Sequence, residues 1–404
     1  MGKKFSPAVW ATAFATLIAF MGIGVVDPIL SSILKAMHAS AFAVEWLFTS
    51  YIAVMALAML LSGVLSTKFG AHRVLIVGLS LVVIFAGLCA LAPNIGVLAL
   101  FRGGWGLGNA FFTSTALSII VGASSGGMAA AITLYEAALG LGMASGPLLG
   151  GFLGSIHWRL PFAGTSTLML IALILTLTLV RDTGKKEAPR TAADLFRAMK
   201  HPGVISNALI GLTYSFAFFT ILAYSPITMT SVSALGLGVV FFAWGVLVGI
   251  SSVFVVNWLR PLMGPVRMLD LNLLCMVAVL VAAALVNQQH WLVIVIIVSG
   301  FFCGISNALF TTLAMEVSPF SRSISSGTYN FLRWSGAAVA PVLDGLLKDA
   351  YGVQVPFWVA AAVMFIGWLG LKWRAGVLDR CLAEQGHAEG HGHGSGHAVQ
   401  ANRT

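Results

Sequence analysis

Ionisable side chains inside long apolar stretches are the residues of this sequence that could carry chemistry. Asp27, Arg102, Glu136 and Arg333 each lie well within such a stretch. An ionised group in the middle of hydrocarbon costs about 3 kcal/mol on insertion scales, so we interpret each one first as functional. A carboxylate there can bind and release a proton, and a guanidinium can hold an anion or favour the ionised form of a nearby carboxylate. Four further acids lie nearer the ends of apolar stretches: Glu45, Asp270, Glu316 and Asp344.

Asp27 and Arg102 are expected at similar depth. Asp27 lies about four residues from the far end of the first stretch, and Arg102 about five residues into the fourth, which enters from that side. We predict that they face each other, with the carboxylate binding a proton and the guanidinium setting its affinity. The alternative is an Asp-Pro helix end in interfacial water, with Arg102 paired elsewhere.

The composition identifies the elements that must position these residues. Of 404 residues, 59% are hydrophobic and 9% are charged, and the mean hydropathy is +0.96. Soluble proteins carry about a quarter charged residues, so a soluble enzyme, a disordered scaffold and a nucleic-acid-binding domain are excluded. The chain is therefore expected to be a membrane protein, and its net charge of +9 indicates basic loops rather than a nucleic-acid partner.

Apolar stretches of about 20 residues, the length that crosses a bilayer, predict twelve transmembrane helices. Most lysines and arginines then fall on the side of the N-terminus. Cytoplasmic loops are rich in these residues, so we expect a multi-pass protein of the cell (inner) membrane with both termini in the cytoplasm. The predicted helices cover residues 8–31, 43–66, 74–92, 97–121, 129–153, 160–180, 204–225, 235–258, 268–287, 291–316, 326–347 and 357–374.

An internal repeat divides the predicted helices into two halves. A shift of 198 residues places Asn109 on Asn307, within GLGNAFFT and GISNALFT. A shift of 194 residues aligns four residues of the fifth helix with four of the eleventh, and Gly70 and Arg73 with Gly264 and Arg267. Matches in the same order indicate two homologous six-helix halves, which are parallel because each has an even number of spans. The aligned pairs of the fifth and eleventh helices are Tyr135 and Tyr329, Gly142 and Gly336, Pro147 and Pro341, and Gly151 and Gly345.

The predicted domains are an N-terminal half at 1–183, a cytoplasmic linker at 184–203, a C-terminal half at 204–375 and a cytoplasmic Gly/His-rich tail at 376–404. Residues 191–200 of the linker could form an amphipathic helix on the inner leaflet or a plain basic connection. Imidazoles of the tail could bind a divalent metal, but a flexible tail supplies no preformed geometry, so we expect neither a metal site nor a cofactor. These imidazoles belong to His387, His391, His393 and His397.

The repeat also bears on the other two buried charges. Glu136 aligns with Asn330, so its carboxylate is not required by the duplicated unit, and we predict that it binds a proton or a cationic substrate. Arg333 could complement an anionic substrate or hold a buried carboxylate, and both readings stay open. Aromatic residues around these charges suit bulky amphipathic ligands through buried area and cation–π contact. The expected lining of a substrate cavity is Tyr329, Arg333, Trp334, Tyr214, Asn109 and Asn307.

The fifth predicted helix carries the pattern Gly-x-x-x-Gly-Pro-x-x-Gly-Gly, formed by Gly142, Gly146, Pro147, Gly150 and Gly151. This pattern resembles the antiporter motif of the drug:proton antiporters of the major facilitator superfamily. Small residues let two helix backbones approach closely, and the proline permits a bend. The segment can therefore be a conformational hinge that seals the two halves, or ordinary close packing, and the two readings are compatible.

Three further segments are similar to motifs of this superfamily. The loop from Gly63 to Arg73, with Lys68 and Gly70, resembles its loop between the second and third spans, which implies a gate on the inner side. Thr67 stands where that loop usually has an acid. Arg102 with Gly106 resembles the arginine motif associated with proton coupling, and Asp27-Pro28 resembles a further antiporter motif.

The resemblance implies an all-α membrane protein of the major facilitator fold that exports a small amphipathic or drug-like compound in exchange for protons. Its expected partners are the lipid bilayer, the small molecule and protons, with no nucleic acid, and we expect a monomer. The alternatives are a metabolite symporter or facilitator, a metal-chelate exporter, and a receptor that binds without transport. The predicted helices carry no nucleophile, phosphate-binding loop or metal cluster, so neither an enzyme nor ATP-driven transport is expected.

Overall fold

The computed structural model describes residues 6–123, 128–180, 197–320 and 322–398. Within these ranges the backbone alone is described at residues 60, 63, 64, 67, 117, 118, 121–123, 128–133, 136, 322–327 and 386–398. The described chain is almost entirely helical and contains no strand. Every long helix is apolar on much of its surface, as expected where lipid rather than water surrounds the protein.

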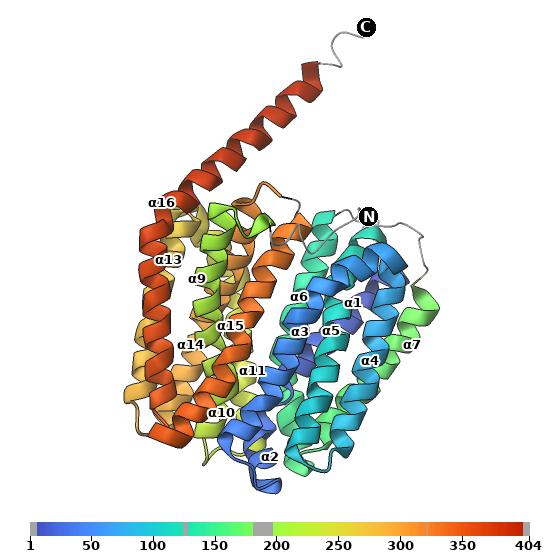
Figure 1. The fold of residues 1–404 in the computed structure, drawn as a ribbon, viewed down its shortest axis with the longest axis vertical. Coiled ribbons are helices and arrows are strands. Elements are labelled where there is room, and N and C mark those ends of the chain that lie inside the picture. Colours follow the sequence, from blue (N-terminus) through green and yellow to red (C-terminus); the bar gives the residue numbers. More distant parts are fainter. Residues whose placement is uncertain (1–5, 124–127, 181–196, 321, 399–404) are drawn as a thin grey trace.

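The helices form an N-terminal and a C-terminal group, at the right and left of Figure 1. The N-terminal group contains α1 (Pro7–Gly24) with η1 (Asp27–Ile29) and α2 (Leu30–Ala36), α3 (Ala41–Phe69), α4 (Ala71–Leu91), α5 (Ile95–Ala123), α6 (Met128–Ile156) and α7 (Leu160–Leu179). The C-terminal group contains α9 (Pro202–Phe219) with η2 (Thr220–Tyr224) and α10 (Ser225–Thr228), α11 (Ala234–Ile250) with η3 (Ser251–Val255) and α12 (Val256–Met263), α13 (Pro265–Leu285), α14 (Gln289–Glu316), α15 (Arg322–Tyr351) and α16 (Val355–Ala398).

The start of α1 and the point where α16 leaves the bundle lie at one end of the bundle, which we call the terminal end, and α2 and α10 lie at the other, the distal end (Figure 1). Within the N-terminal group, α5 packs on α3 and α4, and α1 packs on α6 and α7. Within the C-terminal group, α9 packs on α15 and α16. The largest contacts between the groups are those of α3 with α15 and of α6 with α11.

The first predicted helix, expected to be continuous from 8 to 31, is broken. The α-helix α1 ends at Gly24, the chain bends at Val25 and Val26, and a 3₁₀ turn begins at Asp27 before α2 resumes. Pro28 explains the break, because a proline has no backbone N–H and its ring clashes with the carbonyl group four residues earlier. The break leaves Asp27 at an interruption of the helix rather than on a helical face.

Two helices of the C-terminal group contain a π-helical turn. Residues 220–224 form η2 between α9 and α10, and residues 251–255 form η3 between α11 and α12. Pro226 lies two residues after η2, and prolines and π-helical turns are both causes of kinks in helices. Single π-helical turns inside α-helices occur frequently at functional sites.

Ten of the described segments are long and apolar enough to cross a membrane. These ten segments contain only described residues, and the spans predicted at α5 and α15 are not among them. Within these two helices, Arg102, Asn109 and Asp344 are all buried inside the protein, so their polar groups are directed at other helices.

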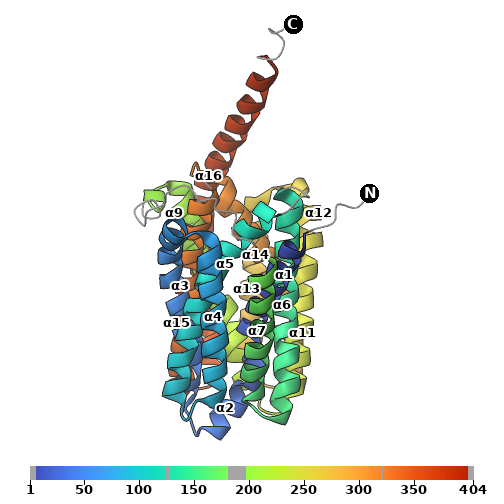
Figure 2. The same ribbon diagram turned by 90° about the vertical axis from the view of Figure 1, so that its right-hand side faces the viewer.

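Two segments outside the bundle were singled out in the sequence. The linker segment at 191–200 falls largely outside the described residues. The tail, expected to be flexible, continues α16 as one helix to Ala398 that projects from the terminal end (Figure 2). The side chains of His387, His391, His393 and His397 lie outside the described part of the structure.

The positions related by the internal repeat have matching backbones. Gly70, between α3 and α4, has φ 89° and ψ 143°, and Gly264, between α12 and α13, has φ 78° and ψ 159°. Both occupy a region that glycine enters without the steric cost of a Cβ atom. Each turn is followed by a helix of 21 residues.

Candidate functional site

Arg102 is the centre of a buried polar cluster between α1, α3 and α5. Its side chain is fully buried, and it donates from Nε to the Leu47 carbonyl oxygen at 3.4 Å and from Nη1 to the Gly22 carbonyl oxygen at 3.5 Å. Its guanidinium carbon lies 4.3 Å from the ring centre of Tyr51 and 4.7 Å from that of Trp105. The charge is therefore held by aromatic faces and carbonyl oxygens rather than by a carboxylate.

Asp27 lies in the same region, at the break in the first helix. Its side chain is fully buried, and neither carboxyl oxygen accepts a hydrogen bond from a described side chain. The positive charge that acts on it is that of Arg102, yet no salt bridge joins the two described groups. The structure thus brings the two predicted residues into one buried region without joining them directly.

Asn109 extends this cluster along α5. Its amide nitrogen donates to the Tyr51 hydroxyl oxygen at 2.5 Å. The two helices are close enough because Gly106 faces α3, where any Cβ atom would overlap the Tyr51 carbonyl oxygen. Tyr51 therefore contacts both Arg102 and Asn109, although nothing in the sequence had singled it out.

The C-terminal group has a second cationic cluster, around Arg333. Its Nη2 atom donates to the side-chain oxygen of Asn307 at 2.6 Å, and the guanidinium carbon lies 5.5 Å from the Trp334 ring and 5.9 Å from the Tyr329 ring. Unlike Arg102, Arg333 is only partly buried. Four of the six predicted cavity residues thus gather in one place, and their contact with a substrate stays a prediction.

Tyr214 sits deeper in the C-terminal group than a cavity residue would. It is fully buried, donates to the Cys303 carbonyl oxygen at 2.9 Å and stacks on Phe310 with 5.4 Å between ring centres. These contacts tie α9 to α14. Its contact with substrate stays a prediction, as does that of Asn109 in the N-terminal cluster.

Two of the predicted site residues lie where no side chain is described, Glu136 on α6 and Gly63 on α3. Thr67, in the position of the expected acid, is also outside the described side chains. Of the other loop residues, Lys68 is exposed and lies 5.3 Å from the Phe69 ring centre, and Arg73 is exposed in the first turn of α4. The proposed inner gate therefore stays a prediction.

The glycine-rich face of α6 makes very close contacts. A Cβ atom at Gly142 or Gly150 would overlap the carbonyl oxygen of Leu17 or Val25 on the first helix, and Pro147 packs on Gly24. These positions fasten α6 to α1 within the N-terminal group, and Gly146 does the same against Met21. This is the close packing expected of small residues between membrane helices.

Gly151 has a different neighbour, because it faces the C-terminal group. A Cβ atom there would lie 2.6 Å from the Ala234 carbonyl oxygen and 2.9 Å from the Gly238 Cα atom of α11. Further along the same pair of helices, Gly245 packs on Ala144. The motif thus contacts α1 of its own group on one face and α11 of the opposite group on another. This arrangement is compatible with a hinge.

The second joint between the groups, α3 with α15, is closed in the middle and distal parts of the bundle. The Thr49 hydroxyl donates to the Ala338 carbonyl oxygen at 2.7 Å, and the Phe42 backbone N–H donates to Asp349 Oδ2 at 3.4 Å. A Cβ atom at Gly345 would lie 2.7 Å from the Phe42 Cα atom. The two groups are therefore in tight contact at the distal end.

Two further buried acids lie in this distal contact, Glu45 on α3 and Asp344 on α15. Both side chains are fully buried, and none of their carboxyl oxygens has a hydrogen-bond partner in the described part of the chain. The sequence placed them near helix ends and assigned them no role. The internal repeat contains a signal, since they align with Val239 and Gly150, so neither acid is required by the duplicated unit.

A cavity of about 510 Å³ lies at the distal end, between α2 and the C-terminal group. Its polar lining includes Lys35, Lys348 and Gln354, and its apolar lining includes Leu34 and Phe357. None of the predicted cavity residues lines it. The cavity is instead a distal vestibule beside the contact of α3 with α15.

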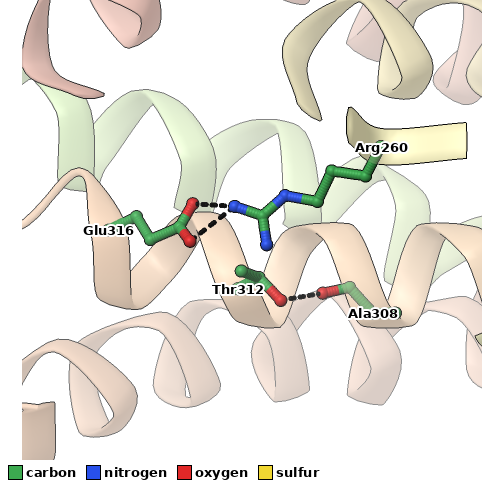
Figure 3. Close-up of polar contacts among 4 residues, drawn as sticks. All are labelled: Arg260, Ala308, Thr312 and Glu316. Carbon is green, nitrogen blue, oxygen red and sulfur yellow. Dashed lines mark hydrogen bonds and ion pairs between the residues drawn. The ribbon is translucent and has the colours of Figure 1, made fainter. Parts of the chain in front are cut away.

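Two acids at the terminal end are paired with basic residues. Figure 3 shows Arg260 of α12 beside Glu316 at the end of α14, where Arg260 Nη2 lies 2.5 and 2.6 Å from the two carboxylate oxygens. Lys372 Nζ and Asp270 Oδ2 form a second pair at 2.7 Å, between α16 and α13. Both pairs lie within the C-terminal group and are partly exposed.

Comparison with known proteins assigns a family to this arrangement. The sequence model of the Major Facilitator Superfamily matches residues 12–341. The chain is 45% identical over 376 residues to a protein named multidrug efflux protein YfmO from Bacillus subtilis (strain 168), a match that covers 92% of this chain and 94% of that protein. It is 22% identical to the quinolone resistance protein NorA of Staphylococcus aureus (strain COL), over 89% of this chain and 94% of that one.

Solved structures give the same fold. A bacterial homologue of the human lysosomal transporter Spinster, crystallised in an inward-facing and occupied conformation, superposes with a TM-score of 0.73 at 17% identity, over 93% of this chain and 97% of that one. The human organic anion transporter MFSD10 superposes with a TM-score of 0.70 at 16% identity, over 90% and 99% of the two chains.

Proposed function

The chain belongs to the Major Facilitator Superfamily, and on that premise we propose that it exports a small amphipathic or drug-like compound in exchange for protons. The names of the Bacillus and Staphylococcus relatives support the class of substrate. The observation that carries proton coupling is Asp27, a carboxyl group that is fully buried, accepts no hydrogen bond from a described side chain and is acted on by the charge of buried Arg102.

The coupling follows from the cost of a buried charge. When ionised, the Asp27 carboxylate is stabilised by Arg102, and when it binds a proton it can be enclosed by apolar neighbours without that cost. Asp27 would exchange its proton with water on one side of the membrane and would be enclosed while the transporter changes conformation. Proton movement would then be linked to alternating access. Glu136 is proposed as a second proton site on α6.

The substrate would bind between the two halves, 1–183 and 204–375, which rock about α6 and α11. The cluster of Arg333, Asn307, Tyr329 and Trp334 is the proposed contact surface for its aromatic or charged part. A cationic ligand would be favoured by the ring faces and disfavoured by Arg333, so a neutral or anionic polar group is expected there.

We further propose that the terminal end faces the cytoplasm and that the protein acts as a monomer in the cell membrane. Exposed basic residues at that end support this orientation, including Lys68, Arg73 and Lys372. On this assignment the distal end is the outer side, and the structure corresponds to a state in which the outer side is closed.

The test is proton flux in energised inside-out vesicles, followed with a pH-sensitive dye while lipophilic cations, neutral drugs and organic anions are added in turn. We expect one class to release protons with the wild type and with Asp379→Asn, an exposed aspartate on α16. Asp27→Asn should abolish this release while the protein folds normally. Full proton-coupled efflux by Asp27→Asn would contradict the proposal, and silence across all compounds would favour a metabolite symporter or facilitator.

A further inference from the structure

The distal contact between the two groups contains three buried carboxyl groups. Asp27 comes from η1, Glu45 from α3 and Asp344 from α15, and each is fully buried. Their six carboxyl oxygens have no hydrogen-bond partner in the described part of the chain. Two of these acids belong to the N-terminal group and one to the C-terminal group, so the cluster exists only while the groups are in contact.

The position of Glu45 and Asp344 follows from the contacts on either side of them. Glu45 lies between Phe42 and Thr49 on α3, and these two residues bond to Asp349 and Ala338 of α15. Asp344 lies between Ala338 and Asp349 on α15. The charges that act on Glu45 are, from largest to smallest, those of Asp344, Asp27 and Lys348. The two acids therefore face each other across the α3 and α15 contact.

The groups around this pair do not neutralise it. Lys348 is partly exposed, and its Nζ atom lies 4.0 Å from Asp349 on the same helix. On η2, the Tyr224 hydroxyl donates to the Val353 carbonyl oxygen at 2.7 Å. The Thr220 hydroxyl donates to the Phe216 carbonyl oxygen at 3.2 Å and also interacts with the Asp344 carboxyl group.

The remaining nearby charge is that of Arg102, which acts on Asp27 and is occupied by aromatic rings and carbonyl oxygens. Two ionised carboxylates facing each other without water or a cation would be strongly destabilising, through lost hydration and mutual repulsion. The closed distal contact is thus compatible with Glu45 and Asp344 only when protons are bound there.

We propose that Glu45 and Asp344 are proton-binding residues that lock the distal side of the transporter. When the side is closed, the two carboxyl groups hold their protons. When α3 separates from α15, water enters, each O–H bond can break with the proton passing to water, and the resulting carboxylates oppose closure. This proposal rests on the alternating access of the proposed function and adds a second proton site to Asp27.

The distal cavity provides a route for these protons. Lys348 lines the cavity of about 510 Å³ and is also one of the charges that act on Glu45. Water in the cavity would therefore approach the pair from the distal side. Protons from that side would favour closure there, which is the order of events that antiport requires if the distal side is outside.

The experiment measures the distal opening directly, without substrate or gradient. The four native cysteines are replaced by alanine, and spin labels are placed at Gly96→Cys at the start of α5 and Gln288→Cys before α14, both exposed at the distal end. Distances between the labels are recorded by pulsed electron paramagnetic resonance in lipid nanodiscs from pH 5.5 to 8.5. One linked proton changes the open-to-closed ratio by up to about tenfold per pH unit.

We expect a short distance at low pH and a growing population at longer distance as the pH rises. The double variant Glu45→Gln, Asp344→Asn should stay closed across this range, and Asp270→Asn, which removes a paired acid at the terminal end, should behave as the wild type. A wild-type distance independent of pH, or the same pH response in the double variant, would overturn the proposal.

Asp27→Asn separates this proposal from the proposed function. If the lock is correct, that variant loses coupled efflux but keeps the pH-dependent distance, because Glu45 and Asp344 remain. If the protein proves not to be an antiporter, efflux measurements fail while the distance still responds to pH. If the double variant does not fold, the single variant Glu45→Gln replaces it. Because one of the two acids remains, this variant should keep a reduced pH response.

Discussion

At the terminal end of the bundle, Glu316 and Asp270 have basic partners and are partly exposed, whereas at the distal end Glu45 and Asp344 are buried and form no ion pair with any described residue. Glu316 and Arg260 are 36% and 32% exposed, and Lys372 with Asp270 forms a similar pair. Glu45 and Asp344 are 0% exposed and have no hydrogen-bond partner in the described residues.

This contrast indicates where protonation can be coupled to movement of the helices. An exposed ion pair keeps most of its hydration, so its formation contributes only about 0.2–1 kcal/mol. A buried carboxyl group gains or loses far more when its surroundings change from protein to water. Only the distal acids therefore make the closing of a helix contact depend on protons.

The largest expected effect comes from preventing the distal contact. Gly345→Leu places a side chain where a Cβ atom alone would lie 2.7 Å from the Phe42 Cα atom, so α3 and α15 could not close. We expect efflux of a fluorescent substrate to fall below about a tenth of the wild-type rate, since a close backbone contact tolerates no added side chain.

Gly376→Leu is the matched control, because no described atom lies within 4 Å of the corresponding Cβ position on α16. Size-exclusion chromatography of both variants establishes that they are folded. Efflux by Gly345→Leu at the wild-type rate would mean that the distal contact is not part of the transport cycle.

The next effect concerns the buried cation beside the distal acids. Arg102→Gln removes the donor to two carbonyl oxygens and the charge that stabilises ionised Asp27. We expect a loss of about 3 kcal/mol in stability, as when one partner of a buried charge cluster is removed, and Arg102→Lys should not restore it because an ammonium lacks the planar fork. Thermal unfolding followed by a thiol-reactive dye measures this.

Arg374→Gln is its control, since Arg374 also lies over a tryptophan, at 4.8 Å from the ring of Trp373, but that ring is 80% exposed. Its unfolding temperature should stay within about 1 °C of the wild type, as for most surface substitutions. If Arg374→Gln lowered the unfolding temperature as much as Arg102→Gln, the burial of Arg102 would not explain its contribution to stability.

The fold could be predicted from the sequence because the patterns that specify it are local. Apolar length alone marked most spans, and repeated glycines such as Gly70 and Gly264 marked matching turns. The break at Asp27 was missed because hydropathy continues through it, although Pro28 was a visible cause. The helical path of α16 beyond residue 375 was missed because Gly- and His-rich composition gives no helical period.

The candidate site was less accessible to prediction, for a physical reason. Depth along two spans brought Asp27 and Arg102 into one region, but their partners depend on how helices turn about their axes. Tyr51 and Trp105, which hold Arg102, are aromatic residues among many in the sequence. Glu45 and Asp344 are close only through a contact between opposite groups, which no pattern within one helix specifies.

The smallest expected effect is at the terminal end. Removing the Arg260 and Glu316 pair by Arg260→Gln or Glu316→Gln should change stability by at most about 1 kcal/mol, because both side chains are about one third exposed. A double-mutant cycle of unfolding temperatures isolates the pair, and about 1 M salt should reduce its coupling through screening. Efflux and the pH response of the distal side should remain close to wild type. Loss of either in the single variants would show that the terminal pair also controls the cycle, and the contrast between the two ends would no longer hold.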